Sequence, residues 1–298
     1  MENLRGIAFM TLAMAGFAIE DAFIKQAALS IPTGQILLVI GLGGAGLFGL
    51  MAWRQGIVLV SPVLWSRPVM LRNGAELVGT LGFVTAITTI PLATASAILQ
   101  VTPLAITMGA ALVFGAAVGW RRWTAILVGI AGVLVIIRPG MNGFDLNALW
   151  ALLGVAGLAG RDLAARAVPR TVSTLQLATY GFAMLVPTGA ILLAVSGGAR
   201  WPDPATWALL GGAVAIGMVA YFAITLASRT GEVAVVAPFR YSRLPFALVI
   251  GYVAFAEVPD AATYAGATLI VGSGLYTLVR ERRLARAAAA EARQTLAR

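Results

Sequence analysis

Ten stretches of about twenty mostly apolar residues follow one another along this chain. They are residues 4–24, 34–53, 69–89, 92–115, 122–138, 147–166, 174–195, 205–227, 233–254 and 261–279. About 20 such residues in a helix are enough to cross the hydrocarbon core of a bilayer. Short turns between several stretches, such as the one broken by Pro91, make neighbouring stretches antiparallel. The sequence therefore predicts an all-α integral membrane protein with ten transmembrane helices.

The composition disfavours other classes of protein. Sixty per cent of the residues are hydrophobic and 11% are charged, whereas soluble domains carry about 25% charged residues. A soluble helical bundle would need polar helix faces to meet water, and none are left. The chain has no Cys and no His, so we expect no disulfide, metal site or other cofactor. It also lacks a GxxxxGK[ST] loop, which argues against ATP-driven transport by this chain.

The basic residues indicate the orientation of the spans. With the N-terminus inside, the inner loops and the C-terminal tail hold most of the arginines, and the outer segments hold only Lys25, Arg138 and Arg200. Cytoplasmic loops carry an excess of Lys and Arg, so we predict that both termini are cytoplasmic. This arrangement explains the net charge of +9 better than nucleic-acid binding does. The tail is expected to be a helix on the anionic inner leaflet or a frayed end.

An internal repeat is visible in the first and sixth spans. The segment "LAMAGFAIED" at 12–21 aligns with "LGVAGLAGRD" at 153–162, and the same offset pairs Thr33 with Thr174. Each repeat holds five spans, an odd number, so the second must be inserted upside down relative to the first. Inverted repeats are typical of secondary transporters, whose binding site lies near the bilayer midplane between the halves.

The repeat predicts the domain organisation. We expect a first five-helix repeat at 1–140, a second, inverted five-helix repeat at 141–279 and a basic cytoplasmic tail at 280–298.

The end of each half supplies a family resemblance. "TPLAITMGAALVFGAAVGWRRWTAILVGIAGVLVII" (102–137) and "LPFALVIGYVAFAEVPDAATYAGATLIVGSGLYTLV" (244–279) each join a Pro-containing helix, a short turn and a Gly-rich helix. This pattern resembles the EamA-type branch of the drug/metabolite transporter superfamily, and it covers nearly the whole chain. The resemblance implies a multi-pass exporter in the bacterial inner membrane, and a monomer is one possible oligomeric state that the sequence leaves open. Within the branch the chain looks most like exporters of amino acids, aromatic ones included.

The ninth span departs from that family pattern. Arg240 and Arg243 replace the apolar residues usual there, between Pro238 and Pro245. An ionisable residue inside a span costs about 2.5–3.5 kcal/mol on insertion scales, so it marks a functional site by default. The two arginines share one helix face. They either have a structural role, or dock a carboxylate of the substrate, or form a gate, and the sequence leaves these readings open.

Other charged residues in the spans extend the candidate site. Glu76, Arg161 and Asp162 are expected in the inner half, where they would join Arg240 and Arg243 in an ion-pair network that seals the cytoplasmic side. The alternative for Glu76 is a local i,i+4 pair with Arg72.

The first span ends with two acids, Glu20 and Asp21. They are candidate proton or substrate-amine sites. The alternative is that they form a helix end in water.

A substrate pocket needs a few polar or aromatic groups near the midplane. The candidates are Gln100, Thr80, Phe83, Tyr221, Tyr241 and Arg240. Such a pocket suits a small amphiphile such as an amino acid.

Three alternative functions were weighed against export of small metabolites. A membrane-embedded enzyme that modifies lipids or metabolites would need clustered acids with a metal, or His, at the membrane surface, and the sequence offers neither. A channel or structural protein is disfavoured by the repeat and the midplane charges. Among transporters, export of drugs, nucleosides or polyamines stays open. The expected partners are a small-molecule substrate and membrane lipids, and the chain is not expected to be an enzyme.

Overall fold

A computed structural model describes residues 2–116, 118–141, 144–169, 171–230 and 233–296. In these ranges the secondary structure is helical throughout, as predicted. The α-helices are α1 (Glu2–Ala27), α2 (Thr33–Arg54), α3 (Arg67–Thr89), α4 (Leu92–Leu99), α5 (Thr102–Phe114), α6 (Trp120–Ile137), α7 (Ala148–Ala165), α8 (Thr174–Val195), α9 (Pro204–Arg229), α10 (Val233–Val236), α11 (Arg243–Phe255) and α12 (Ala261–Leu296). Two 3₁₀ helices, η1 (Pro62–Trp65) and η2 (Ala237–Ser242), complete the described elements.

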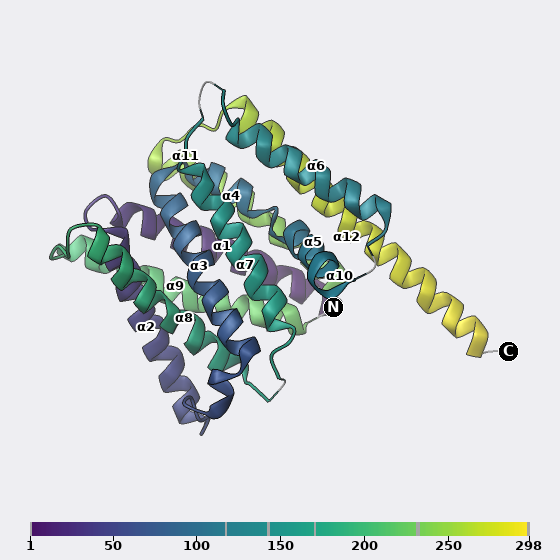
Figure 1. Cartoon of the computed structure of the whole chain (residues 1–298), viewed down its shortest axis with the longest axis horizontal. Helices are drawn as coiled ribbons and strands as arrows, with labels where there is room; N and C mark the ends of the chain where they lie inside the picture. Colours follow the sequence, from purple (N-terminus) through teal and green to yellow (C-terminus); the bar gives the residue numbers. More distant parts are fainter. Residues whose placement is uncertain (1, 117, 142–143, 170, 231–232, 297–298) are drawn as a thin grey trace.

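These elements form ten rods within the described ranges (Figure 1), because α4 and α5 make one rod and α10, η2 and α11 make another. Eight rods are long and apolar enough to cross a membrane. The other two are α3, which carries Arg72 and Glu76, and the broken rod α10–η2–α11, which carries Arg240 and Arg243. Eight of the ten predicted spans are therefore found, and the two exceptions hold four of the charged residues of the candidate site, Arg72, Glu76, Arg240 and Arg243.

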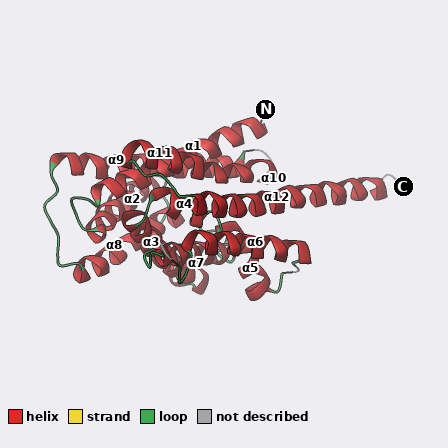
Figure 2. Ribbon diagram, turned by 90° about the horizontal axis from the view of Figure 1, so that it is seen from above, coloured by secondary structure: helices red, strands yellow, loops and turns green. Residues whose placement is uncertain are grey.

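The ends of the rods define two faces of the bundle. We call the end where α1 begins the near end and the end where α1 stops the far end. The last rod returns to the near end, and α12 continues beyond it through part of the basic tail to Leu296. This extension projects from the bundle (Figure 2).

The rods pack in specific pairs across the molecule. α1 packs on α9, α2 on α8, α3 on α7, α6 on α12 and α4 on α11. Glycines allow the close approach of α3 and α7, because a Cβ on Gly79 would lie 2.7 Å from the backbone nitrogen of Leu158. This crossing brings the charged residues of α3 and α7 together.

Two rods are interrupted at prolines. α4 stops at Leu99, and α5 starts at Thr102 with Pro103 in its first turn. In the other rod, Pro238 lies in the first turn of η2, and Pro245 follows the start of α11. A proline has no N–H to donate, so the regular helical ladder is broken at these points. Short 3₁₀ stretches inside a helix often mark a functional hinge.

Candidate functional site

Four charged side chains from α3 and α7 form one ion-pair network in the near half of the bundle. Glu76 accepts from Arg72 at 3.1 Å through one carboxylate oxygen and from Arg161 at 3.0 Å through the other. Asp162 pairs with Arg161 at 2.8 Å. Glu76 therefore forms both the local pair with Arg72 and the pair with Arg161 that the sequence analysis considered as alternatives. We call Arg72, Glu76, Arg161 and Asp162 the near-half network.

The local structure explains why these four meet. Arg72 and Glu76 lie one turn apart on α3, and α7 approaches α3 closely at the glycine crossing. Arg72 also donates to the amide oxygen of Asn73 at 3.0 Å. Glu76 and Arg72 are buried, and a buried charge is tolerated when it is paired and hydrogen-bonded.

Arg240 lies near this network without an ion pair among the described residues. Its closest electrostatic neighbours are Asp162, Arg161 and Tyr241. Arg240 is an exposed residue. The amide of Gln100, at the break between α4 and α5, donates to the Arg240 carbonyl oxygen at 3.4 Å. The two helix breaks are therefore in contact.

Arg243 faces a different partner from the one expected. It donates to Asp21 of α1 at 2.6 Å, and its guanidinium lies 5.5 Å from the ring centroid of Phe17 and 5.1 Å from that of Phe83. Asp21 is only 4% exposed and lies six residues before the end of α1, so it is not a helix end in water. The structure thus brings Arg243 and Asp21 together, away from the near-half network.

Glu20 neighbours this pair on the side of α9. A Cβ on Gly217 would lie 2.5 Å from a carboxylate oxygen of Glu20, so the carboxylate packs against the glycine. Glu20 interacts electrostatically with Asp21 and Arg243.

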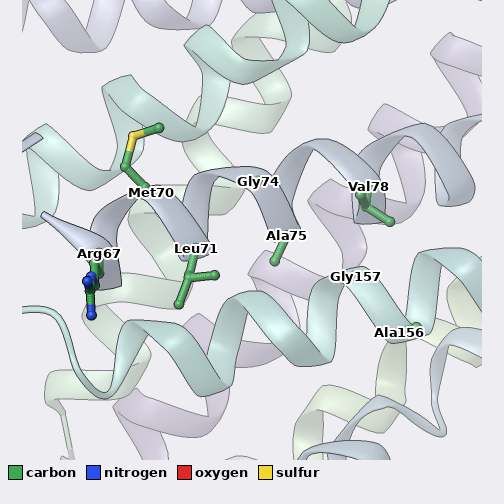
Figure 3. Close-up of a pocket in the computed structure, with 8 residues that line it drawn as sticks. All are labelled: Arg67, Met70, Leu71, Gly74, Ala75, Val78, Ala156 and Gly157. Carbon is green, nitrogen blue, oxygen red and sulfur yellow. The ribbon is translucent and has the colours of Figure 1, made fainter. Parts of the chain in front are cut away.

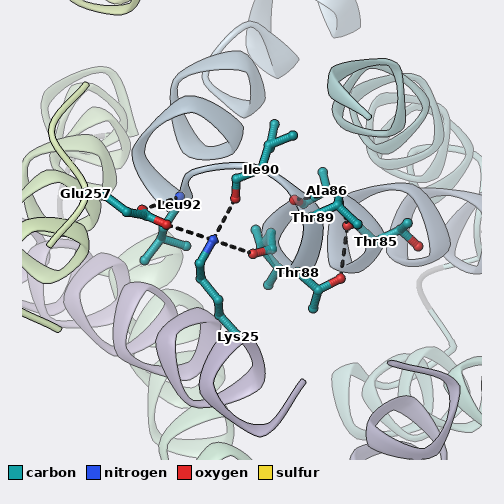
Figure 4. A network of polar contacts seen from close by, with 9 residues as sticks. Lys25, Thr85, Ala86, Thr88, Thr89, Ile90, Leu92 and Glu257 are labelled. Carbon is teal, nitrogen blue, oxygen red and sulfur yellow. Dashed lines mark hydrogen bonds and ion pairs between the residues drawn. The ribbon is translucent and has the colours of Figure 1, made fainter. Parts of the chain in front are cut away.

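A second network lies at the far end (Figure 4). Lys25, near the end of α1, pairs with Glu257 at 2.9 Å and donates to the carbonyl oxygens of Ile87 at 3.1 Å and Ile90 at 2.7 Å. The other carboxylate oxygen of Glu257 accepts from the backbone N–H of Leu92 at 2.7 Å. Both charged side chains are at most 15% exposed. These contacts, which we call the far-end latch, join α1, the α3–α4 turn and the residues after α11.

Arg138 and Asp260 form another ion pair at the far end. Asp260 caps α12, and hydrogen bonds from Thr263 together with Arg138 hold the pKa of its carboxyl below the usual value. Two of the three basic residues expected on the outer side, Lys25 and Arg138, are thus neutralised by acids.

Two of the remaining predicted pocket residues, Tyr221 and Thr80, lie beside the near-half network. Tyr221 of α9 lies in electrostatic range of Arg72, Glu76 and Arg161 and packs edge-on against Phe48, with ring centroids 5.1 Å apart. Thr80 is half-buried one turn beyond Glu76 on α3.

Tyr241 does not join the pocket set. Its hydroxyl contacts Gly274 of α12 and has no hydrogen-bond partner. Because α12 packs against η2, this ring contributes to helix packing.

One groove of about 690 Å³ lies on the outer face of α3 and α7. Figure 3 shows its lining residues, which are Arg67, Met70, Leu71, Gly74, Ala75, Val78, Ala156 and Gly157. Leu71 is 68% exposed, and the face is nearly all apolar, as expected for a surface in contact with lipid tails. Arg72 and Glu76 of α3 are not among the residues that line it.

Comparison with known proteins identifies the family. Over 223 residues the chain is 30% identical to a riboflavin transporter of Rhizobium johnstonii, covering 73% of this chain and 70% of that protein. The chain belongs to the drug/metabolite transporter superfamily, in its EamA-type branch. It is also 29% identical over 279 residues to the pseudopaline exporter CntI of Pseudomonas aeruginosa, covering 89% of this chain and 93% of that protein. The identity to an S-adenosylmethionine uptake transporter of Rickettsia prowazekii is 25% over 222 residues, which is 73% of this chain and 74% of that protein.

The chain was also compared with protein-family models and with solved structures. No protein-family model matches this drug/metabolite transporter. A solved structure with 18% sequence identity superposes with a TM-score of 0.58, over 92% of this chain and 98% of that chain, which shows a common fold. The family resemblance expected from the sequence is confirmed. The protein is a multi-pass membrane protein and a secondary transporter of small metabolites, and its relatives are transporters, not enzymes.

Sequence reasoning missed the far-end latch. Lys25 is the chain's single lysine, and the distribution of basic residues places it in an outer segment without indicating a partner. The signal available was that both Lys25 and Glu257 lie directly at the ends of apolar spans, where opposite charges can pair across helices.

Proposed function

We propose that this transporter exports small metabolites from the bacterial cytoplasm by alternating access, and that amino acids with neutral or aromatic side chains are its first candidate substrates. The observation that carries this proposal is the difference between the two ends of the bundle. The charged side chains of the far-end latch are at most 15% exposed, whereas Arg240 in the near half is an exposed residue. A carrier closed at one end and accessible from the other has the arrangement that alternating access requires.

The packing pairs support two inverted repeats related by a two-fold axis, with all ten rods crossing the membrane. If the first five rods correspond in order to the last five, the pair α1–α9 is the counterpart of α7–α3. The pairs α2–α8, α4–α11 and α6–α12 each map onto themselves. The two helix breaks, at Gln100 and in η2, also fall at corresponding places. These regularities support the proposed boundaries 1–140 and 141–279.

We further propose that the near end is cytoplasmic. Most of the arginines lie in the near-end segments and the C-terminal tail, and cytoplasmic segments carry an excess of Lys and Arg. Export then starts from the open, near-end state. The similarity to the pseudopaline exporter covers more of this chain than the similarity to the uptake transporter, which also supports export.

Counterflow in proteoliposomes tests the proposal. Purified protein is reconstituted, vesicles are loaded with an unlabelled candidate, and uptake of the labelled candidate is followed. The panel contains phenylalanine, leucine and threonine, with riboflavin and S-adenosylmethionine included because they appear in the relatives' names. Polyamines and nucleosides represent the remaining exporter classes.

A carrier gives saturable uptake that is stimulated by substrate on the opposite side. Saturable counterflow with amino acids supports the proposed substrate class. Saturable counterflow with riboflavin alone replaces that class and keeps the carrier. Linear flux without trans-stimulation, for every compound, contradicts the carrier mechanism itself.

A further inference from the structure

The charges around the near-half network do not balance. Arg72, Arg161 and Arg240 supply three positive charges, and Glu76 and Asp162 supply two negative ones. Among the residues that the structure describes, this leaves a surplus of one positive charge. A charge inside a membrane protein is costly unless it is paired or reaches water, so the surplus cation needs either an anion or solvent.

The acids of the network are already engaged by other arginines. Each carboxylate oxygen of Glu76 accepts from a different arginine, Arg72 or Arg161. One oxygen of Asp162 accepts two donors of Arg161, at 2.9 and 2.8 Å. Among the described residues, Arg240 is therefore the arginine of this group that has no ion pair.

The position of Arg240 suits it to bind a molecule that enters from the near end. It lies in η2, about seven residues from the start of its rod, and it is exposed at the surface of the protein. The hydrogen bond from Gln100 to its carbonyl oxygen ties this segment to the break between α4 and α5. A guanidinium offers a planar fork of donors that matches a carboxylate in a bidentate geometry.

We propose that Arg240 is the anion-recognition residue of this transporter, and that it docks a carboxylate of the transported molecule. The proposal rests on the proposed transport function and deepens it, because it predicts which chemical group of the substrate is read. The surplus of one charge matches a monoanionic group such as a carboxylate. Amines and polyamines, in contrast, would meet the repulsion of a positive site.

Binding by matched compounds tests this site without requiring flux. The thermal unfolding midpoint of the purified protein is measured with phenylalanine, leucine and phenylacetate, and with the amides of all three. We expect the carboxylates to raise the midpoint and the amides to have little effect. Inorganic phosphate and phosphoserine are added to detect a preference for a dianion.

Variants separate the role of charge from that of folding. Arg240→Gln should weaken carboxylate binding at least about tenfold, the loss expected for a charge-assisted hydrogen-bonded pair. Arg240→Lys keeps the charge without the fork and should bind with intermediate affinity. Arg67→Gln is the matched control, because Arg67 is an exposed arginine at the near end outside the network, and it should bind like the wild type.

Each outcome decides the proposal. The proposal is overturned if acids and amides have equal effects, or if carboxylate binding survives Arg240→Gln. It is also overturned if phosphate is preferred, or if no carboxylate stabilises the protein. Flux separates the two proposals. Saturable counterflow that Arg240→Gln leaves unchanged overturns the role of Arg240 and keeps the carrier, whereas unsaturable flux in the wild type overturns the carrier.

Discussion

At the scale of single residues, the two acids of the near-half network differ in the number of arginines that each one pairs with. Glu76 is 11% exposed at its side chain and holds both Arg72 and Arg161. Asp162 is 28% exposed and holds Arg161 alone. Removing one partner of a buried pair costs about 3–5 kcal/mol because it leaves an uncompensated charge, and a more exposed pair is worth much less. The two acids should therefore respond differently to neutralisation.

Glu76→Gln is predicted to lower the thermal unfolding midpoint clearly, because Arg72 loses its carboxylate partner and Arg161 keeps only Asp162. Asp162→Asn is the matched control and should lower the midpoint by a small fraction of that amount, since Glu76 still pairs with Arg161. Thermal unfolding of the detergent-solubilised variants at one scan rate gives the comparison. Equal midpoints for the two variants would show that the network does not depend on Glu76.

The Asp21–Arg243 pair allows a double-mutant cycle. Arg243→Leu should destabilise the protein because it leaves the buried Asp21 unpaired. Asp21→Asn should destabilise it less, because the rings of Phe17 and Phe83 still contact the guanidinium. The double variant should regain part of the stability lost by Arg243→Leu. The coupling between Asp21 and Arg243 is measured from the unfolding midpoints of the wild type, the two single variants and the double variant. If the effects of the two single variants add up in the double variant, the two side chains are not coupled.

At the scale of elements, helix packing controls the distance between charged groups. The α3–α7 crossing depends on glycine at the contact, because a Cβ on Gly157 would collide with the backbone of Gly79. One turn along α7, a Cβ on Gly160 would meet only the side chain of Ala75, at 3.6 Å, an ordinary contact. Two glycines of one helix thus have different steric surroundings.

Gly157→Ala is predicted to push α3 and α7 apart and to cost about 1–3 kcal/mol through overpacking. It should also weaken the Glu76–Arg161 pair, because these residues lie on the two separated helices. Gly160→Ala is the matched control and should be neutral or stabilising, since alanine favours a helix by about 1 kcal/mol over glycine. Unfolding midpoints and counterflow are measured for both, and a Gly157→Ala protein as stable as the control would contradict the close crossing.

The helices could be predicted from the sequence more completely than their contacts. Apolar length alone locates the ends of the rods to within a few residues, except for the end of α12 at Leu296, because the bilayer sets that length. The near-half network was also predicted for Glu76, Arg161 and Asp162, since all three lie in the inner parts of their spans. Hydropathy carries no information on which helix faces meet, so the partner of Arg243 was not predicted.

Local geometry explains that miss. The sequence was read as a regular α-helix through Arg240, but η2 is a 3₁₀ helix, which rises about 2.0 Å per residue compared with about 1.5 Å. Six residues of η2 therefore displace Arg243 about 3 Å further toward the far end. α1 also continues to Ala27, three residues beyond the predicted span, which places Asp21 inside the bundle.

At the scale of the whole molecule, alternating access requires the far end to open when the near end closes. The far-end latch joins α1, the α3–α4 turn and Glu257 after α11. Opening the far end must break these contacts, so their strength affects the balance between the two states. The chain has no cysteine, and a single introduced cysteine therefore reports access to one position.

Glu257→Gln is predicted to shift the transporter toward the state open at the far end. The reporter is Thr80→Cys, on α3 one turn beyond Glu76, labelled by a membrane-impermeant maleimide added outside intact cells. With Glu257 present, labelling should be slow because the latch is closed. Neutralising Glu257 removes the ion pair to Lys25 and should raise the labelling rate several-fold. Asp260→Asn is the control, because Asp260 pairs with Arg138 at the same end without joining the latch.

Sidedness controls make the result interpretable. Ser196→Cys lies in an exposed far-end turn and Val60→Cys in an exposed near-end loop. If the near end is cytoplasmic, the reagent labels the first in intact cells and the second only after permeabilisation. With that pattern in place, an unchanged Thr80→Cys rate in Glu257→Gln would mean that the latch does not hold the far end closed. The reverse pattern would instead place the latch on the cytoplasmic side, and export would then have to begin by breaking it.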